Sequence, residues 1–421
     1  MDNSDSVASR FALTGTRRLI ALVVLGMVLL ALTERFARIP TTDLTSSGTW
    51  SIALGWSIPI LMAGLGGMFS ERSGVVNIGL EGLLILGTWF GAYGTVVTGS
   101  PWLGILFAIV AGGVGGLVMA VATVSFGVDH IIVGTAILVM APGISRYLSG
   151  LLFPDHGGSI TQSPNLGGVS TFSVPFLAGG AIFGWESPDI LGSIERSNAF
   201  LASEAAGILR GFVFQMSWFT LIGILVIPGS AWVLWRTRFG LRLRSVGESP
   251  DAADSLGIDV YRYKYYGVII SGLLAGYGGG FLAIQLSGLY KEGQTQGKGF
   301  IGLATMIFGN WRPGGTASGA LLFGFTETLR LRDPAAPHAL LLFVAIVLGL
   351  FALRAGLQRR VVPAAGLGVA GLLIFWYYMA VDTVPNQLPQ ITPFIAVIVV
   401  LLFATRRLRM PAADGQIWIK D

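Results

Sequence analysis

The sequence predicts an all-α polytopic membrane protein, and its composition carries that prediction. Of the 421 residues, 53% are hydrophobic and only 12% are charged, whereas soluble domains carry roughly 25% charged residues. The mean hydropathy is +0.72. So few charges cannot cover the surface of a soluble globule, and so much apolar chain excludes disorder. At about 20 residues per crossing, the chain has room for roughly ten to twelve transmembrane helices.

Twelve apolar segments are the predicted helices, because a helix satisfies its own backbone where lipid offers no water. In chain order they are Leu19–Thr33, Trp50–Phe69, Val75–Val97, Trp102–Phe126, Ile131–Phe153, Val213–Trp235, Tyr265–Tyr290, Phe300–Trp311, Thr316–Leu329, Ala339–Leu353, Val361–Val381 and Leu388–Thr405. The eighth segment is too short for a full crossing and is followed by Arg312-Pro313-Gly314-Gly315. We therefore expect a broken or re-entrant helix there.

Basic residues divide unevenly between the two sides of the membrane. With the N-terminus inside and the segments alternating, 18 Lys and Arg residues lie inside and 9 outside, which is the positive-inside direction. Both termini are thus expected in the cytoplasm, as tails of residues 1–18 and 406–421 around a membrane domain of residues 19–405. Residues 154–212 become a long outer loop, and residues 236–264 become a cytoplasmic loop.

Two parts of the chain resemble each other. The hexapeptide Gly64–Phe69 recurs as Gly276–Phe281, and Ile78-Gly79-Leu80, followed by Gly-Thr-Trp, recurs as Ile301-Gly302-Leu303, followed by Gly-Asn-Trp. Under the predicted topology the two copies enter from opposite sides, so the repeat is inverted, as in many transporters with a site near the midplane. A chance likeness between glycine-rich helix pairs is the alternative.

The chain offers little chemistry of its own. Gly293–Gly299 superficially resembles a phosphate-binding loop, but Gly293 is one residue too close to Gly297, and Gly299 replaces the required hydroxyl residue. The three His residues lie far apart in sequence and Cys is absent, which disfavours metal sites. We predict no enzyme, no bound metal and no nucleic-acid partner, and any nucleotide-driven step belongs to another chain.

The densest charge lies between Arg236 and Lys264, with six basic and four acidic residues. Within this loop the sequence predicts a short helix that starts at Ser249 as N-cap, has proline at its first position and acids in its first turn, and ends at Gly257. Ala252 and Ala253 would then be presented to a groove on a partner. A solvated connector is the alternative.

Several motifs resemble one family. Gly247–Ala253, with Gly257-Ile258 and Ser271–Gly276 after it, is similar to the coupling-helix region of ABC importer permeases of the branched-chain amino acid/ribose type. Glu71–Gly82 resembles the shorter permease subunit of the nucleoside branch, which depends on a basic membrane lipoprotein. Gly299–Gly309 and the tail from Pro411 to Lys420 are similar to that branch as well. The matches cover roughly residues 50–153, 213–330 and 388–421.

The chain departs from that family in two places. Residues 154–212 form a longer outer loop than usual, and residues 339–381 add two probable extra spans. Two additional spans keep the C-terminus on the inner side. The enlarged outer face could fit a different binding protein, so the cargo is less firmly implied than the class.

The resemblance implies a permease subunit of an ATP-driven ABC importer in the plasma membrane. Its implied partners are an ABC ATPase subunit, a second related permease, an outer substrate-binding lipoprotein and membrane lipid. ATP and magnesium would bind in the partner ATPase, and this chain would bind no cofactor. Nucleosides are the implied cargo, with a simple sugar or riboflavin as alternatives. The implied coupling residues are Gly247, Glu248, Ser249, Ala252, Ala253 and Gly257.

A substrate pathway is expected beside the repeat. Asn77 and Glu81 are spaced four apart, which puts them on one face of the third predicted helix, and a buried carboxylate in a membrane helix usually faces a polar interior. We expect this face to line the translocation cavity, with Phe300 and Thr305 on the opposing repeat. The alternatives are a structural network in which Glu81 touches no cargo, and a self-sufficient secondary transporter that uses Glu81 for ion coupling.

Overall fold

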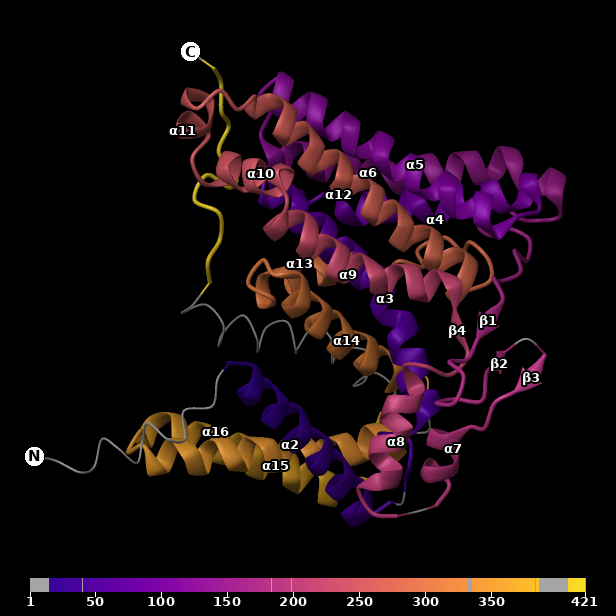
Figure 1. Cartoon of the computed structure of the whole chain (residues 1–421), viewed down its shortest axis with the longest axis vertical. Coiled ribbons are helices and arrows are strands. Elements are labelled where there is room, and N and C mark those ends of the chain that lie inside the picture. Colours follow the sequence, from indigo (N-terminus) through magenta and orange to yellow (C-terminus); the bar gives the residue numbers. More distant parts are fainter. Residues whose placement is uncertain are drawn as a thin grey trace, which may run out of the picture. The chain divides into compact units, whose positions relative to one another are not determined.

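The computed structural model is mostly helical and divides into two compact units, which are described separately below (Figure 1). It describes residues 15–39, 41–182, 184–197, 199–329, 331, 335–382, 384–385 and 408–420. Within these ranges eight helices are long and apolar enough to cross a membrane. The predicted all-α polytopic membrane fold is therefore confirmed.

The larger unit comprises Ser51–Phe172, Gln215–Thr328 and Gln390–Asp421. Its helices include most of α3 and are, in chain order, α3 (Ser47–Glu71), α4 (Leu80–Thr98), α5 (Pro101–Ala120), α6 (His130–Leu152), α9 (Trp218–Arg236), α10 (Arg238–Glu248), α11 (Pro250–Ser255), α12 (Val260–Phe281), α13 (Lys298–Phe308) and α14 (Pro313–Leu329). The π-helical turns η1 (Val121–Ser125) and η3 (Leu282–Leu286) extend α5 and α12, and a short 3-10 turn, η2 (Pro154–His156), follows α6. Two short strands, β1 (Thr171–Phe172) and β4 (Met216–Ser217), pair antiparallel.

Small residues allow α4, α5 and α12 to pack at very close range. They recur at four-residue intervals on α5: Gly104, Ala108, Gly112 and Gly116. A methyl carbon added at Gly112 would lie 2.2 Å from the carbonyl oxygen of Gly272 in α12, and one added at Gly87 of α4 would lie 2.5 Å from the carbonyl oxygen of Gly276. Such stripes are the usual device of membrane helices that pack backbone against backbone. In Figure 1 the three helices run side by side.

The two copies of the hexapeptide repeat lie on α3 and α12, which run antiparallel to each other. A methyl carbon at Gly278 of α12 would lie 3.1 Å from the carbonyl oxygen of Pro59 in α3, and one at Gly66 of α3 would lie 2.7 Å from that of Ser271 in α12. Residue numbers thus rise along one helix as they fall along the other, as an inverted repeat requires. The second block is less equivalent, because Leu80 begins α4 whereas Leu303 lies inside α13.

The short eighth segment is broken, as predicted. Helix α13 has only 11 residues, and α14 begins five residues after it ends, at Pro313. Between them Asn310 and Trp311 adopt positive φ angles of 54° and 51°, which are uncommon outside glycine. The indole Nε1 of Trp311 donates a 2.6 Å hydrogen bond to the Glu71 carboxylate at the end of α3. This buried bond holds the break in a backbone conformation that is otherwise costly.

Most predicted segment bounds agree with the helices to within a few residues, but two segments start too early and the predicted Tyr265–Tyr290 starts after α12 has begun at Val260. Residues 72–79 form turns, so α4 begins at Leu80, and strand β4 delays the start of α9 to Trp218. Hydropathy did not separate these turns from the helices because both are apolar. The predicted last span, Leu388–Thr405, and most of the predicted N-terminal tail lie outside the described residues.

The smaller unit comprises Met1–Trp50, Ser173–Phe214 and Leu329–Pro389. Its described elements are α2 (Gly15–Phe36), β2 (Ala181–Ile182), β3 (Trp185–Glu186), α7 (Ile190–Glu195), α8 (Ala202–Gly211), α15 (Ala335–Leu357) and α16 (Val361–Ala380). Helices α15 and α16 pack on each other, and each is long and apolar enough to cross a membrane. They correspond to the two extra spans expected from the sequence.

One arginine joins several parts of this unit through ion pairs and hydrogen bonds. Arg210 of α8 pairs with Asp189 at 2.7 Å and with Glu195 at 3.3 Å, and it donates a 3.0 Å hydrogen bond to the hydroxyl of Ser47. Burial alone would raise the pKa of Asp189. Hydrogen bonds from Arg210 and from the Gly192 N–H outweigh it, so the pKa lies below its ordinary value and the carboxylate stays charged. The segment between α6 and α9 is thus folded, with short helices and strands.

Candidate functional site

The charged loop between α9 and α12 contains the short helix that its sequence predicts. Helix α11 has six residues with Pro250 at its first position. Gly257 follows it with a φ of +76°. The Gly257 N–H donates to the carbonyl of Asp254 at 2.8 Å, and the Ile258 N–H donates to the carbonyl of Ala253 at 3.0 Å. These two bonds form a Schellman motif. Ser249 occupies the N-cap position, but its side chain makes no capping bond.

The two alanines of α11 face opposite ways, which corrects the expectation that both meet a partner. Ala252 is exposed, whereas Ala253 is 2% exposed and packs against Val246 and Val260. The outward face instead carries Leu256, which is 82% exposed. A leucine between the acidic residues Asp254 and Asp259 of a highly charged loop is the signal that could have identified Leu256 from the sequence.

Gly247 and Glu248 connect α10 to the end of α3. A methyl carbon at Gly247 would lie 2.3 Å from the carbonyl oxygen of Arg72, so only glycine allows this approach. Glu248 lies 3.6 Å from the Arg72 guanidinium and accepts the N–H of Ala412 at 3.2 Å. Glu248 therefore ends α10 and joins the loop to the end of α3 and to the C-terminal segment.

Glu81 binds the start of the broken helix α13. Its carboxylate accepts the backbone N–H groups of Gly297 at 2.9 Å and Gly299 at 2.6 Å, and the residue is only 5% exposed. Free N–H groups at a helix N-terminus favour an anion. The segment that resembles a phosphate loop therefore holds a carboxylate of its own chain. This geometry fits the structural alternative for Glu81.

Asn77 and Glu81 do not share a helical face. Asn77 lies in the turn before α4, fully buried, and its Nδ2 donates to the hydroxyl of Ser271 in α12 at 2.9 Å. The expected spacing failed because the helix starts only at Leu80. No donor among the described residues reaches Asn77 Oδ1, so its amide is a partly satisfied part of the contact between α12 and the turn before α4.

Thr305 and Phe300 occupy opposite faces of α13. Thr305 is fully buried, its hydroxyl donates to the carbonyl of Gly302 at 2.7 Å, and Gly64 and Gly319 approach it from α3 and α14. Phe300 is 41% exposed. Of the four expected pathway residues, the structure thus leaves Phe300 available to a ligand and places Asn77, Glu81 and Thr305 in the supporting core.

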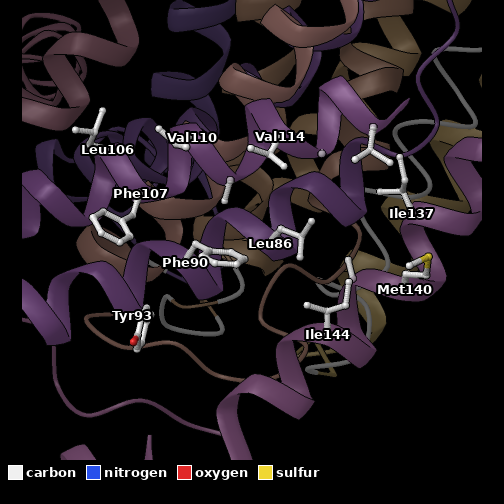
Figure 2. Close-up of a pocket in the computed structure, with 14 residues that line it drawn as sticks. Leu86, Phe90, Tyr93, Leu106, Phe107, Val110, Val114, Ile137, Met140 and Ile144 are labelled. Atoms are coloured by element: carbon white, nitrogen blue, oxygen red, sulfur yellow. The ribbon is translucent and has the colours of Figure 1, made fainter. Parts of the chain in front are cut away.

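A large apolar groove lies between α4, α5 and α6. Its volume is about 650 Å³. Figure 2 shows Leu86 and Phe90 of α4, Val114 of α5, and Ile137 and Met140 of α6 along its walls. Nearly all lining atoms are apolar, so the groove matches hydrocarbon and lacks the donors and acceptors that would orient a polar solute.

A bundle of glycine-packed apolar helices, with a broken helix packed against it and a short helix in its charged loop, defines an integral membrane transport component. The chain belongs to the family described as the branched-chain amino acid transport system permease component, which matches residues 50–353. It is a permease and not an enzyme. No solved structure is significantly similar to it.

Named relatives cover most of the chain. The nucleoside ABC transporter permease protein NupC of Lactococcus lactis is 32% identical over 87% of this chain and 95% of its own. The guanosine ABC transporter permease protein NupQ of Bacillus subtilis is 36% identical over 74% of this chain and 92% of its own. The putative glucose ABC transporter permease protein TsgC13 of Haloferax volcanii is 32% identical over 66% of this chain and 78% of its own.

Proposed function

We propose that this chain is the permease subunit of an ATP-driven nucleoside importer in the plasma membrane. The cargo rests on one observation: the nucleoside and guanosine permeases named above share 32% and 36% identity with nearly their whole lengths aligned. ATP and magnesium would bind in a partner ATPase. A second, related permease and an outer substrate-binding lipoprotein would complete the importer.

The partner ATPase would dock on the outward face of α11. That helix is short, ends in a Schellman motif, and exposes Ala252 and Leu256. A lone, strongly exposed leucine next to a small residue is a suitable apolar anchor for a groove. The other coupling residues would hold the helix in place without touching the ATPase. They are Gly247, Glu248, Ser249, Ala253 and Gly257.

The cargo would pass along the exposed face of α13. Phe300 offers an aromatic surface on which a nucleobase could stack. Asn77, Glu81 and Thr305 would fix the position of α13 without touching the cargo. A secondary transporter is disfavoured, because the Glu81 carboxylate is already committed to two backbone N–H groups.

A simple sugar is the second candidate cargo, because the putative glucose permease is 32% identical over 66% of this chain. The test is uptake of labelled guanosine, adenosine and uridine by cells that express the complete importer. Unlabelled nucleosides, glucose, ribose and riboflavin serve as competitors. We expect nucleosides alone to compete. Competition by glucose alone would assign a sugar importer instead.

The proposed topology places both termini and α11 in the cytoplasm and the segment between α6 and α9 outside. The chain contains no Cys, so single Cys residues at Gly158 and Ser255 report without background. An impermeant thiol reagent added to intact cells should label the Gly158→Cys variant alone. Labelling of Ser255→Cys would reverse the topology.

A further inference from the structure

The C-terminal segment of the chain, Pro411–Lys420, lies along the loop that carries α11 (Figure 1). The N–H of Ala413 donates to the carbonyl of Gly247 at 2.9 Å, and the N–H of Ala412 donates to Glu248 at 3.2 Å. The segment is thus joined to the last turn of α10 by its backbone. A segment some 160 residues distant in sequence has become part of the cytoplasmic loop.

The end of this segment holds α11 directly. The indole Nε1 of Trp418 donates a 2.7 Å hydrogen bond to Asp251, and the Lys420 ammonium lies 3.0 Å from the carboxylate of Asp254. The Trp418 ring packs at 5.1 Å from that of Tyr261, at the start of α12, and contacts the cluster that buries Ala253. Both acidic residues of α11 are therefore paired with the C-terminal segment.

The middle of the segment reaches the ends of two membrane helices. The Lys264 ammonium of α12 donates to the carbonyl of Gln416 at 3.2 Å. The carboxyl group of Asp414 is mostly buried and lies against that of Glu71 at the end of α3. Glu71 in turn binds Trp311 in the break before α14. A continuous set of contacts thus runs from α11 through the segment to α3, α12 and the broken helix.

We propose that Pro411–Lys420 is a brace that positions α11 and transmits its displacement to the membrane helices, with Trp418 and Lys420 as its positioning residues on α11. This inference rests on the proposed function, since it takes an ATPase as the source of the displacement. Within the loop from α10 to α12, α11 is held at its two ends and by the packing of Ala253 against Val246 and Val260. The brace adds lateral contacts, so that α11 moves together with α3 and α12.

The test uses the complete importer, with its ATPase, second permease and binding protein, in proteoliposomes that take up labelled guanosine. Uptake and ATP hydrolysis are measured together. Trp418→Phe keeps an aromatic side chain, although a smaller one, and removes the indole N–H, and Lys420→Glu reverses the charge. We expect guanosine taken up per ATP to fall about fivefold in each variant, as the loss of one hydrogen bond of ordinary net strength would give, while ATP hydrolysis continues.

Two matched variants separate positioning from general damage. Lys420→Arg keeps the charge and should behave as wild type, and Asp254→Lys combined with Lys420→Glu should restore coupling by exchanging the two charges. A nitroxide on Ser255→Cys reports the mobility of α11 in the permease, which should rise when residues 411–421 are deleted.

The outcomes distinguish this inference from the proposed function. A wild-type complex that takes up no nucleoside overturns both. Wild-type uptake with unchanged uptake per ATP in Trp418→Phe and Lys420→Glu overturns the brace alone. Equal loss in the single charge reversal and in the exchanged pair also overturns the proposed positioning by Lys420.

Discussion

The carboxylate of Glu81, in the first turn of α4, accepts the backbone N–H of Gly299, in the first turn of α13, at 2.6 Å. The two residues lie 218 positions apart and belong to opposite copies of the internal repeat. A methyl carbon at Gly299 would lie 2.5 Å from the Glu81 Cα, so glycine is required for this approach. The bond fixes where the broken helix begins.

Glu81→Gln should destabilise the permease. Glutamine keeps one acceptor oxygen but places an NH₂ group against one of the two backbone donors, and losing a charged hydrogen-bond acceptor costs about 1–3 kcal/mol. Thermal unfolding in detergent should occur at lower temperature, and uptake should fall with it. Glu186→Gln, at an exposed position, is the control. An unchanged unfolding temperature would mean that the cap contributes nothing.

Arginine should have different effects at the two alanines of α11. Ala253→Arg must displace α11 from Val246 and Val260, and overpacking of this kind costs about 1–3 kcal/mol. We expect the isolated permease to unfold at lower temperature. Ala252→Arg projects outward, so it should leave the unfolding temperature unchanged and weaken ATPase co-purification. Normal co-purification with Ala252→Arg would remove that face from the proposed docking site.

Gly112→Ala should disrupt the packing of α5 on α12. The added methyl would lie 2.2 Å and 2.6 Å from backbone atoms of Gly272 and Gly276, and backbone cannot yield as a side-chain tip can. We expect a loss of folding stability of about 1–3 kcal/mol. Gly143→Ala in α6 is the matched control, because nothing lies within 4 Å of its added methyl. Equal unfolding temperatures for the two variants would contradict the close contact.

The docking of the C-terminal segment should depend on pH. Burial raises the pKa of Asp414 to about 7. Hydrogen bonds from Glu71 and from the Gly415 N–H lower this pKa, as do the charges of Lys264 and Arg72, but burial has the larger effect. Because this pKa exceeds the ordinary value of 3.8, the docked segment holds a proton that the released segment loses. Docking is therefore strongest at low pH and weakens as pH rises through about 7.

A nitroxide on Ile417→Cys, near the middle of the segment, measures this dependence. Its mobility should increase between pH 6 and pH 8 in the wild-type background. Asp414→Asn cannot ionise, so it should show the same low mobility at both pH values. A pH-dependent signal that persists in Asp414→Asn would assign the titration to another group.

The sequence by itself determined the membrane fold and the local elements. Apolar length predicted the helices, and the run from Arg312 to Gly315 predicted the break between α13 and α14. The proline at position 250 and Gly257 predicted both ends of α11. These features are set by residues close together along the chain. Hydropathy determines the membrane helices, the fixed φ of proline favours a helix start, and the ability of glycine to adopt a left-handed conformation favours a helix end.

Only the tertiary structure decided which face of each element is buried. Ala252 and Ala253 are identical in type and adjacent in sequence, yet Val246, Val260 and Trp418 cover one of them and leave the other exposed. Likewise, nothing local showed that Glu81 would meet Gly297 and Gly299. Such partners come from distant parts of the chain, and a six-residue helix is too short for its own pattern to specify a buried side.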